Sequence, residues 1–205
     1  TVTAYVKGEV FEIAWLVGET DIQAATKLVT AINAATDRVP VTAANGGGTL
    51  AVVTNTAKIP VGSTVAVIGA STNPTKLGYA VLNNLLQGGF LKEDRRVYPI
   101  NPTAESILGQ PCFKSVLAVP GPIDLAVIVI PYPSVPDALR ECGEKAIRAA
   151  IVISAGFREA GWEGAERERE LLEVARQFSI RLIGPNCFGV IDTITPLNAT
   201  FSAGM

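Results

Sequence analysis

The feature that constrains the fold most is an almost uninterrupted apolar run, Asp-Leu-Ala-Val-Ile-Val-Ile, at residues 124–130. A strand this apolar has both faces buried, which is typical of parallel sheets that helices cover on both sides. Further strand patterns occur at 64–68, 96–100, 149–154, 181–183 and 189–192, with helical patterns among them at 76–86, 134–147 and 164–178. Because right-handed crossovers join such strands, the sequence predicts an α/β fold built on a doubly wound parallel sheet.

Residues 1–58 follow a different pattern. Strand-rich runs at 1–6 and 9–17 meet at Lys7-Gly8, and runs at 39–43 and 49–54 flank Asn45-Gly46-Gly47-Gly48. Both pairs are predicted to be β-hairpins, and apolar residues at helical spacing predict a helix over 21–35. We therefore expect a small α+β (ββαββ) module at 1–58, followed by the doubly wound domain at 59–205.

Composition excludes several classes of function. The 205 residues carry 17 basic and 19 acidic side chains, and this balance offers no electrostatic footprint for nucleic acid or a membrane surface. No apolar run reaches the length of a transmembrane helix. Cys112, Cys142 and Cys187 are an odd number at wide spacing, which argues against a disulfide framework and favours a reducing cytoplasm. The absence of histidine excludes histidine-based acid–base, nucleophilic, metal and phosphoryl-carrier chemistry within these residues.

Ligands of a doubly wound sheet lie outside the carboxyl ends of its strands, so the segment from Gly69 to Gly78 is the first candidate. Gly69 permits a tight turn, Ser71 and Thr72 carry hydroxyls, and a helix that begins near Lys76 points free N–H groups at a phosphate. The spacing matches neither the dinucleotide-binding G-x-G-x-x-G pattern nor a P-loop. A strand-to-helix turn without a ligand is therefore an open alternative at this point.

The second strand gives a sharper test of the ligand. A nicotinamide-binding unit places Asp or Glu at this strand tip, where the carboxylate accepts hydrogen bonds from the ribose hydroxyls. Here the tip reads Tyr98-Pro99-Ile100-Asn101-Pro102, without a carboxylate. A hydride-transferring dehydrogenase is therefore disfavoured, and a nucleotide with a different phosphate arrangement fits better.

Five motifs follow one another along the chain: Val67-Ile68-Gly69-Ala70-Ser71, Lys76-Leu77-Gly78, Tyr98-Pro99-Ile100-Asn101-Pro102, Ile153-Ser154-Ala155-Gly156-Phe157 and Gly184-Pro185-Asn186-Cys187. In this order they closely resemble the CoA-binding domain of NDP-forming acyl-CoA synthetases, such as acetate–CoA ligase (ADP-forming). The succinyl-CoA synthetase α subunit is a more distant relative, and the resemblance covers about residues 59–205. The fold that it implies is a Rossmann-like doubly wound sheet.

The resemblance implies coenzyme A as the ligand and assigns it a path along the strand ends. The turn at Gly69 and the following loop would hold the phosphates and the adenosine end, the second strand tip would line the adenine, and the later strand tips would border the pantetheine arm and the thioester. The residues implied in CoA binding are Gly69, Ser71, Thr72, Lys76, Leu77, Asn101, Pro102, Ile130, Pro131, Ile153, Ser154, Ala155 and Asn186.

Some of these residues can also have purely structural roles that involve no ligand. Pro99, Pro102 and Pro131 can serve only to end strands, and Lys76 can be a solvated charge at a helix start. Cys187, which the resemblance places near the thioester chemistry, fits a small buried apolar residue better than a thiolate.

The family reaction passes through an acyl phosphate and a phosphohistidine, with an ATP-grasp domain or subunit as phosphoryl donor or acceptor. The resemblance places that histidine in a further domain, and this sequence ends at Met205 where that domain would begin. Because the sequence contains no histidine, we expect it to bind CoA without completing the reaction alone. Its implied partners are the phosphohistidine domain and the ATP-grasp domain or subunit.

The acidic residues after the fourth strand pattern allow two interpretations, a catalytic pair of carboxylates or a solvated helix face. Glu166, Glu168, Glu170 and Glu173 alternate with basic residues, which is the usual look of a solvated helix face. Glu159 lies closer to a strand tip, and we expect it to contact the ligand or a partner domain.

Residues 1–58 resemble a small module of contractile phage tail sheath proteins, through Val10–Glu19, Gly18-Glu19-Thr20-Asp21, Ala31-Ile32-Asn33-Ala34 and Val39–Ala44. An engineered fusion, a natural fusion and chance similarity are all compatible with this combination. It also gives an alternative function, in which residues 1–58 drive self-association into a homo-oligomer and the larger domain is scaffold.

Overall fold

The computed structural model describes residues 2–6, 9–13, 41–45, 51–55, 62–92, 94–192 and 196–202. The chain divides into two compact units, Thr1–Ile59 and Pro60–Met205. In the first unit, β1 (Val2–Val6) pairs antiparallel with β2 (Glu9–Ile13), and β3 (Val41–Asn45) pairs antiparallel with β4 (Ala51–Asn55). Both predicted hairpin pairings are therefore confirmed, while the helix expected over 21–35 lies outside the described residues.

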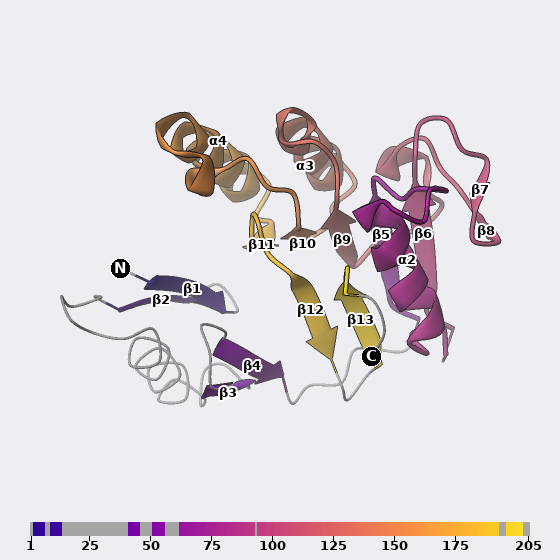
Figure 1. Cartoon of the computed structure of the whole chain (residues 1–205), viewed down its shortest axis with the longest axis horizontal. Helices are drawn as coiled ribbons and strands as arrows, with labels where there is room; N and C mark the ends of the chain where they lie inside the picture. Colours follow the sequence, from indigo (N-terminus) through magenta and orange to yellow (C-terminus); the bar gives the residue numbers. More distant parts are fainter. Residues whose placement is uncertain are drawn as a thin grey trace. The chain divides into compact units, whose positions relative to one another are not determined.

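The second unit is built on a five-stranded parallel sheet (Figure 1). Its spatial order is β11-β10-β9-β5-β6, so the first strand along the chain lies between the second and the third. This is the flavodoxin-like order of a doubly wound sheet, and it confirms the predicted fold class. The strands are β5 (Thr64–Ile68), β6 (Arg96–Ile100), β9 (Leu125–Ile128), β10 (Ala149–Val152) and β11 (Arg181–Ile183).

Both faces of the sheet are covered (Figure 1). Helices α3 (Val135–Glu144) and α4 (Trp162–Gln177) pack side by side over one face. The other face carries α2 (Leu77–Gln87) and the antiparallel hairpin of β12 (Gly189–Asp192) and β13 (Leu197–Thr200). Short elements complete the unit: the β7–β8 hairpin (Ser106–Ile107, Gln110–Pro111) and the 3₁₀ turns η1 (Val116–Ala118), η2 (Tyr132–Ser134) and η3 (Arg158–Ala160).

Burial follows the two-sided pattern that the apolar runs predict. In β5, Val65 and Val67 are buried on one face, and Ala66 and Ile68 on the other. In β9, residues 126–128 are all fully buried. Consecutive residues of a strand point to opposite faces, so both faces of this sheet are packed against other elements. Within the described residues, no helix is long and apolar enough to cross a membrane.

The structure corrects two of the expected elements. Residues 189–192 do not close the parallel sheet but pair antiparallel with β13, and Gly189 lies so close to the Ala199 carbonyl that a β-carbon there would overlap it. The helix expected over 134–147 ends at Glu144, since the chain turns through Ala146 at φ 63°. Ser134, which the sequence predicts as its cap, lies at the N-cap position, but its side chain makes no capping hydrogen bond.

Candidate functional site

The main pocket lies at the carboxyl ends of β5 and β9, where the strand order reverses. It has a volume of about 510 Å³ and is formed by the chain just after β5, β6, β9 and β10. A doubly wound sheet places its ligand at such a point, because neighbouring connections leave on opposite faces and open a crevice. Nine of the predicted CoA-binding residues line it: Gly69, Ser71, Lys76, Leu77, Asn101, Ile130, Pro131, Ser154 and Ala155.

Two glycines bring the β5–α2 turn close to its neighbours. Gly69 adopts φ +90°, and a β-carbon there would overlap the Val129 carbonyl oxygen and lie 2.6 Å from Ile130 Cγ2. Gly78, in the first turn of α2, packs directly on the Gly69 carbonyl, which a β-carbon at 78 would overlap. Only glycine fits at either position without moving the backbone, so the helix start is held against the strand end.

The loop between these glycines offers a site for an anion. Ser71 Oγ accepts a hydrogen bond from the Asn73 N–H at 3.1 Å, and Asn73 Oδ1 accepts one from the Thr75 N–H at 2.9 Å. These local bonds shape the loop while Lys76 remains exposed beside the pocket. The first turn of α2 contains no acidic residue. The positive end of the helix dipole and the Lys76 ammonium therefore act together on whatever binds there.

Asn101 joins the tip of β6 to this loop. Its Nδ2 donates to the Ala70 carbonyl at 2.8 Å, and its Oδ1 accepts from the Thr103 N–H at 2.9 Å and the Ala104 N–H at 3.1 Å. Asn101 lines the pocket, as the sequence predicts. These bonds fix the loop after β5, and the bond to Ala70 uses one of the two N–H donors of the Asn101 amide.

The opposite wall is formed by the segments after β9 and β10. Ser154 is 9% exposed, and its Oγ accepts a hydrogen bond from the Ile130 N–H at 3.2 Å. This contact ties the ends of the two strands together. Ile130, Pro131 and Ala155 then present mostly apolar surface to the pocket, which suits a flexible chain better than a phosphate.

Four predicted residues do not line the pocket: Thr72, Pro102, Ile153 and Asn186. Thr72 and Pro102 are exposed near its rim, and Ile153 is buried at the end of β10. The Asn186 N–H donates to the Ser154 carbonyl at 2.9 Å, so this residue holds the segment that follows β10.

Four lining residues were not among the predicted ones: Ala70, Gly78, Val129 and Tyr132. A glycine in the first turn of a helix is a usable sequence signal for Gly78, since glycine disfavours helix interiors unless a close approach needs it. Nothing local marks Tyr132, whose partners come from distant segments of the chain.

Glu159 has a structural role. Its carboxylate accepts hydrogen bonds from the N–H groups of Gly156 and Phe157, and so closes the turn after β10. Slight burial raises the pKa of Glu159, but these backbone donors outweigh it and hold the pKa below its ordinary value. The expectation that Glu159 contacts a ligand or a partner domain stays a prediction.

Cys187 is half-buried rather than fully buried as expected. Its Sγ donates to the Val152 carbonyl at 3.4 Å, and burial raises the pKa of the thiol. A raised pKa disfavours the thiolate, the reactive form, at neutral pH. Across the described part of the chain, no group of His, Cys, Asp and Glu side chains could hold a metal ion.

Residues 63–193 match the family model described as "CoA binding domain". The chain is 51% identical over 138 residues to acetate–CoA ligase (ADP-forming) I of Archaeoglobus fulgidus. It is 48% identical over 139 residues to the alpha subunit of acetate–CoA ligase (ADP-forming) II of Pyrococcus furiosus. The aligned region is 67% of this chain but only 19% and 29% of these relatives, so the chain spans less than a third of either.

A solved structure of an acetyl-coenzyme A synthetase is also similar to this chain. The dinucleotide forming acetyl-coenzyme A synthetase 1 of Ca. Korarchaeum cryptofilum, in complex with phosphate and ADP, superposes with a TM-score of 0.63 at 42% identity. The match covers 68% of this chain and 29% of that one. The family resemblance of the larger domain is therefore confirmed, whereas residues 1–58 lie outside the family match.

Proposed function

Residues 63–193 make this chain a member of the CoA-binding domain family, and from that membership we propose how CoA lies in the pocket and which reaction the domain serves. The observation that carries the proposal is the pocket at the β5–β9 reversal, which has a cationic helix start on one side and an apolar wall on the other. CoA has a matching division, with phosphates at its nucleotide end and a long, weakly polar pantetheine arm.

The β5–α2 loop fits the phosphates. Ser71 and Lys76 lie beside the N-terminus of α2, where backbone N–H groups and the helix dipole favour negative charge. Leu77 is 48% exposed at this edge of the pocket, and an adenine ring would cover it. Thr72 and Pro102, on the exposed rim, would border the nucleotide from outside.

The pantetheine arm then follows the apolar wall. Ile130, Pro131 and Ala155 border its path, and Ser154 holds the two strand ends in register. Ile153 and Asn186 would act from behind this wall rather than by touching the arm. The thiol of bound CoA supplies the group that is acylated, and the residues of this chain hold it at the strand ends.

The reaction proposed for the whole protein is the ADP-forming ligation of an acid to CoA. Relatives with this activity are about three to five times longer than the aligned region, and this chain contains no histidine. A phosphohistidine domain and an ATP-grasp domain or subunit would therefore supply the phosphoryl chemistry. The three free cysteines are compatible with a reducing cytoplasm as the location.

Calorimetric titration of the chain with CoA tests the proposal, with NADH and ATP as competitors for the same pocket. We expect saturable, micromolar CoA binding and no response to NADH, because the β6 tip has no carboxylate to accept the ribose hydroxyls. CoA should also be displaced poorly by ATP, which lacks the pantetheine arm. Tighter binding of NADH than of CoA would overturn the assignment, and acyl-CoA formation by the isolated chain would contradict its catalytic incompleteness.

Residues 1–58 carry a separate proposal, that they mediate self-association. The resemblance to a tail-sheath module, which stays a prediction from the sequence, motivates this proposal together with the two antiparallel hairpins of the first unit. Sedimentation over a range of concentrations tests it directly. A mass that rises with concentration in the full chain, but not after deletion of residues 1–58, is the expected result; equal masses would contradict the proposal.

A further inference from the structure

Tyr132 occupies an unusual position at the end of β9. It opens η2, it is 37% exposed, and it lines the main pocket. It also lines a neighbouring cavity of about 320 Å³ between α3 and α4. Tyr132 therefore borders both cavities.

Two groups from other parts of the chain contact the ring. The guanidinium carbon of Arg167, on α4, lies 4.3 Å from the ring centroid in a cation–π contact. Gly156, in the turn after β10, also packs against the ring: a β-carbon there would lie 2.5 Å from Tyr132 Cδ1. Gly156 also has φ +107°, so any side chain at this position would both strain the turn and displace the ring.

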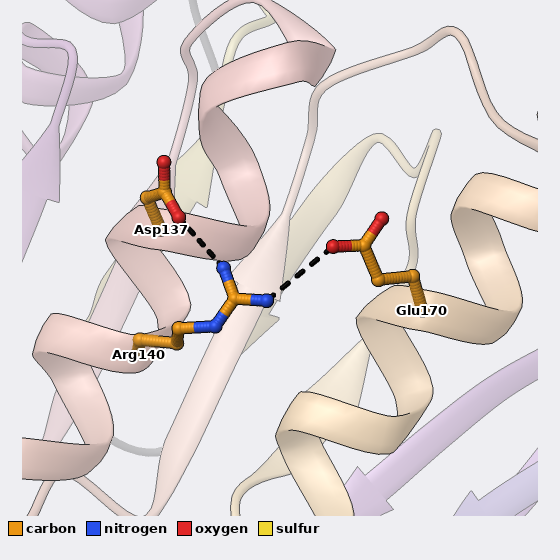
Figure 2. A network of polar contacts seen from close by, with 3 residues as sticks. All are labelled: Asp137, Arg140 and Glu170. Carbon is orange, nitrogen blue, oxygen red and sulfur yellow. Dashed lines mark hydrogen bonds and ion pairs between the residues drawn. The ribbon is translucent and has the colours of Figure 1, made fainter.

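The surroundings of Arg167 fix this arrangement. Its Nη1 donates to the Gly156 carbonyl at 3.1 Å, and its Nη2 pairs with Glu163 at 3.0 Å. Figure 2 shows the adjacent network, in which Arg140 on α3 contacts Asp137 on its own helix and Glu170 on α4. Both arginines of the smaller cavity are therefore already paired with carboxylates. That cavity is better understood as the support behind Tyr132 than as a second anion site.

Strand order locates the ring relative to the nucleotide end. Asn101 and the loop after β5 lie on the β6 side of the pocket, whereas Tyr132 and Gly156 follow β9 and β10 on the other side. We propose that Tyr132 is a specificity-determining residue that packs on the pantetheine arm near its thiol end, held in place by Arg167 and Gly156. This inference rests on the proposed placement of CoA.

Two ligands separate this contact from the rest of the site: CoA, and 3′-phospho-ADP, which is its nucleotide part without the pantetheine arm. Replacement Tyr132→Ala should weaken CoA binding about tenfold, the value of one lost aromatic contact of moderate area, and leave 3′-phospho-ADP affinity unchanged. Tyr132→Phe keeps the ring and should restore CoA binding. Trp162→Ala, which removes an aromatic side chain that is 78% exposed, is the control for loss of a surface aromatic.

Arg167→Met tests the support without altering the main pocket lining. It keeps an unbranched side chain against the ring but removes the cation and the hydrogen bond to Gly156, so CoA binding should weaken by about threefold, with 3′-phospho-ADP again unaffected. Equal loss of both ligands in Tyr132→Ala would overturn the inference, as would unchanged binding of both. If the unmodified chain binds CoA no more tightly than it binds 3′-phospho-ADP, the proposed path of the pantetheine arm is wrong. If it binds neither ligand, the proposed function itself fails.

Discussion

The two sides of the pocket are built by different physical means. The turn side, Gly69–Gly78 with Asn101, depends on backbone approaching backbone at positions where no β-carbon fits. The network side, comprising Tyr132, Ser154–Glu159 and Arg167, depends on side chains that hold one another through ring contacts and hydrogen bonds. Steric exclusion is all-or-none, while a network distributes its energy over several contacts. Single substitutions should therefore have large effects on the turn side and graded effects on the network side.

The sharpest test of this difference is Gly69→Val. The new side chain would overlap the Val129 carbonyl and meet Ile130, at a backbone φ of +90° that valine strongly disfavours. We expect a loss of about 3–5 kcal/mol of folding stability and no measurable CoA binding, because strain and overlap add at one position. Urea unfolding gives the stability and calorimetry gives the binding.

A matched control separates overlap from backbone strain. Gly121 has φ +76° and no atom within 4 Å of the position that a β-carbon would take. Gly121→Val should therefore cost only the strain, about 1–2 kcal/mol, and leave CoA affinity unchanged. Equal destabilisation by the two substitutions would show that the turn side does not depend on close approach.

Asn101→Asp should have the next largest effect. The change removes the donor to the Ala70 carbonyl and sets a carboxylate against that oxygen, while the contacts to Thr103 and Ala104 remain. We expect a loss of about 2 kcal/mol of stability and a roughly tenfold weaker affinity for CoA, since a negative charge is added beside the phosphate subsite. Thr103→Val removes only one hydroxyl contact. It should change folding stability and CoA affinity far less than Asn101→Asp does. Wild-type CoA affinity in Asn101→Asp would show that the loop holds its shape without this link.

The same division explains what the sequence could reveal. The turn side can be predicted from the sequence, because close approach demands glycine and apolar runs show where strands end. The sequence therefore predicts Gly69, Lys76 and Asn101 at the pocket. The network side cannot be predicted in this way, because Tyr132 and Arg167 are 35 positions apart and meet only after α3 and α4 have packed. Likewise, residues 189–192 have a strand pattern, but no local signal distinguishes a sixth parallel strand from the hairpin with β13.

Lys76→Ala tests the part of the turn side that contacts the ligand but not the fold. Lys76 is exposed and precedes α2, so its loss should leave stability unchanged within error. CoA binding should weaken by about 1–2 kcal/mol, as for a charge-assisted contact with phosphate. The difference should shrink at high salt because the lysine is open to solvent.

Lys114→Ala provides the corresponding control, since this exposed lysine does not line the pocket. Its CoA affinity should match that of the unmodified chain at every salt concentration. Unchanged affinity in Lys76→Ala would remove Lys76 from the site and leave the helix N-terminus as the main phosphate contact.

The smallest effect is expected on the network side, at Glu159, and pH reveals it. The backbone donors at Gly156 and Phe157 hold the pKa of Glu159 below its ordinary value of 4.5, so the folded state favours the carboxylate. Its contribution to stability is therefore fully present above about pH 4.5 and is lost as the pH falls through the lower, folded-state pKa. Because the group is largely exposed, screening limits that contribution to less than about 1 kcal/mol.

Glu159→Gln should thus be less stable than the unmodified chain at pH 7, with a gap that closes below pH 4.5. Urea unfolding at pH 7, 5, 4 and 3 measures the gap, and Glu173→Gln, on the exposed part of α4, reports the loss of a surface carboxylate elsewhere. The Gly156 turn supports the Tyr132 ring, so Glu159→Gln should also weaken the binding of CoA slightly more than the binding of 3′-phospho-ADP. A gap that stays constant with pH would mean that Glu159 acts through its shape rather than its charge. The network side would then depend on the fit of its side chains, as the turn side depends on the fit of its backbone.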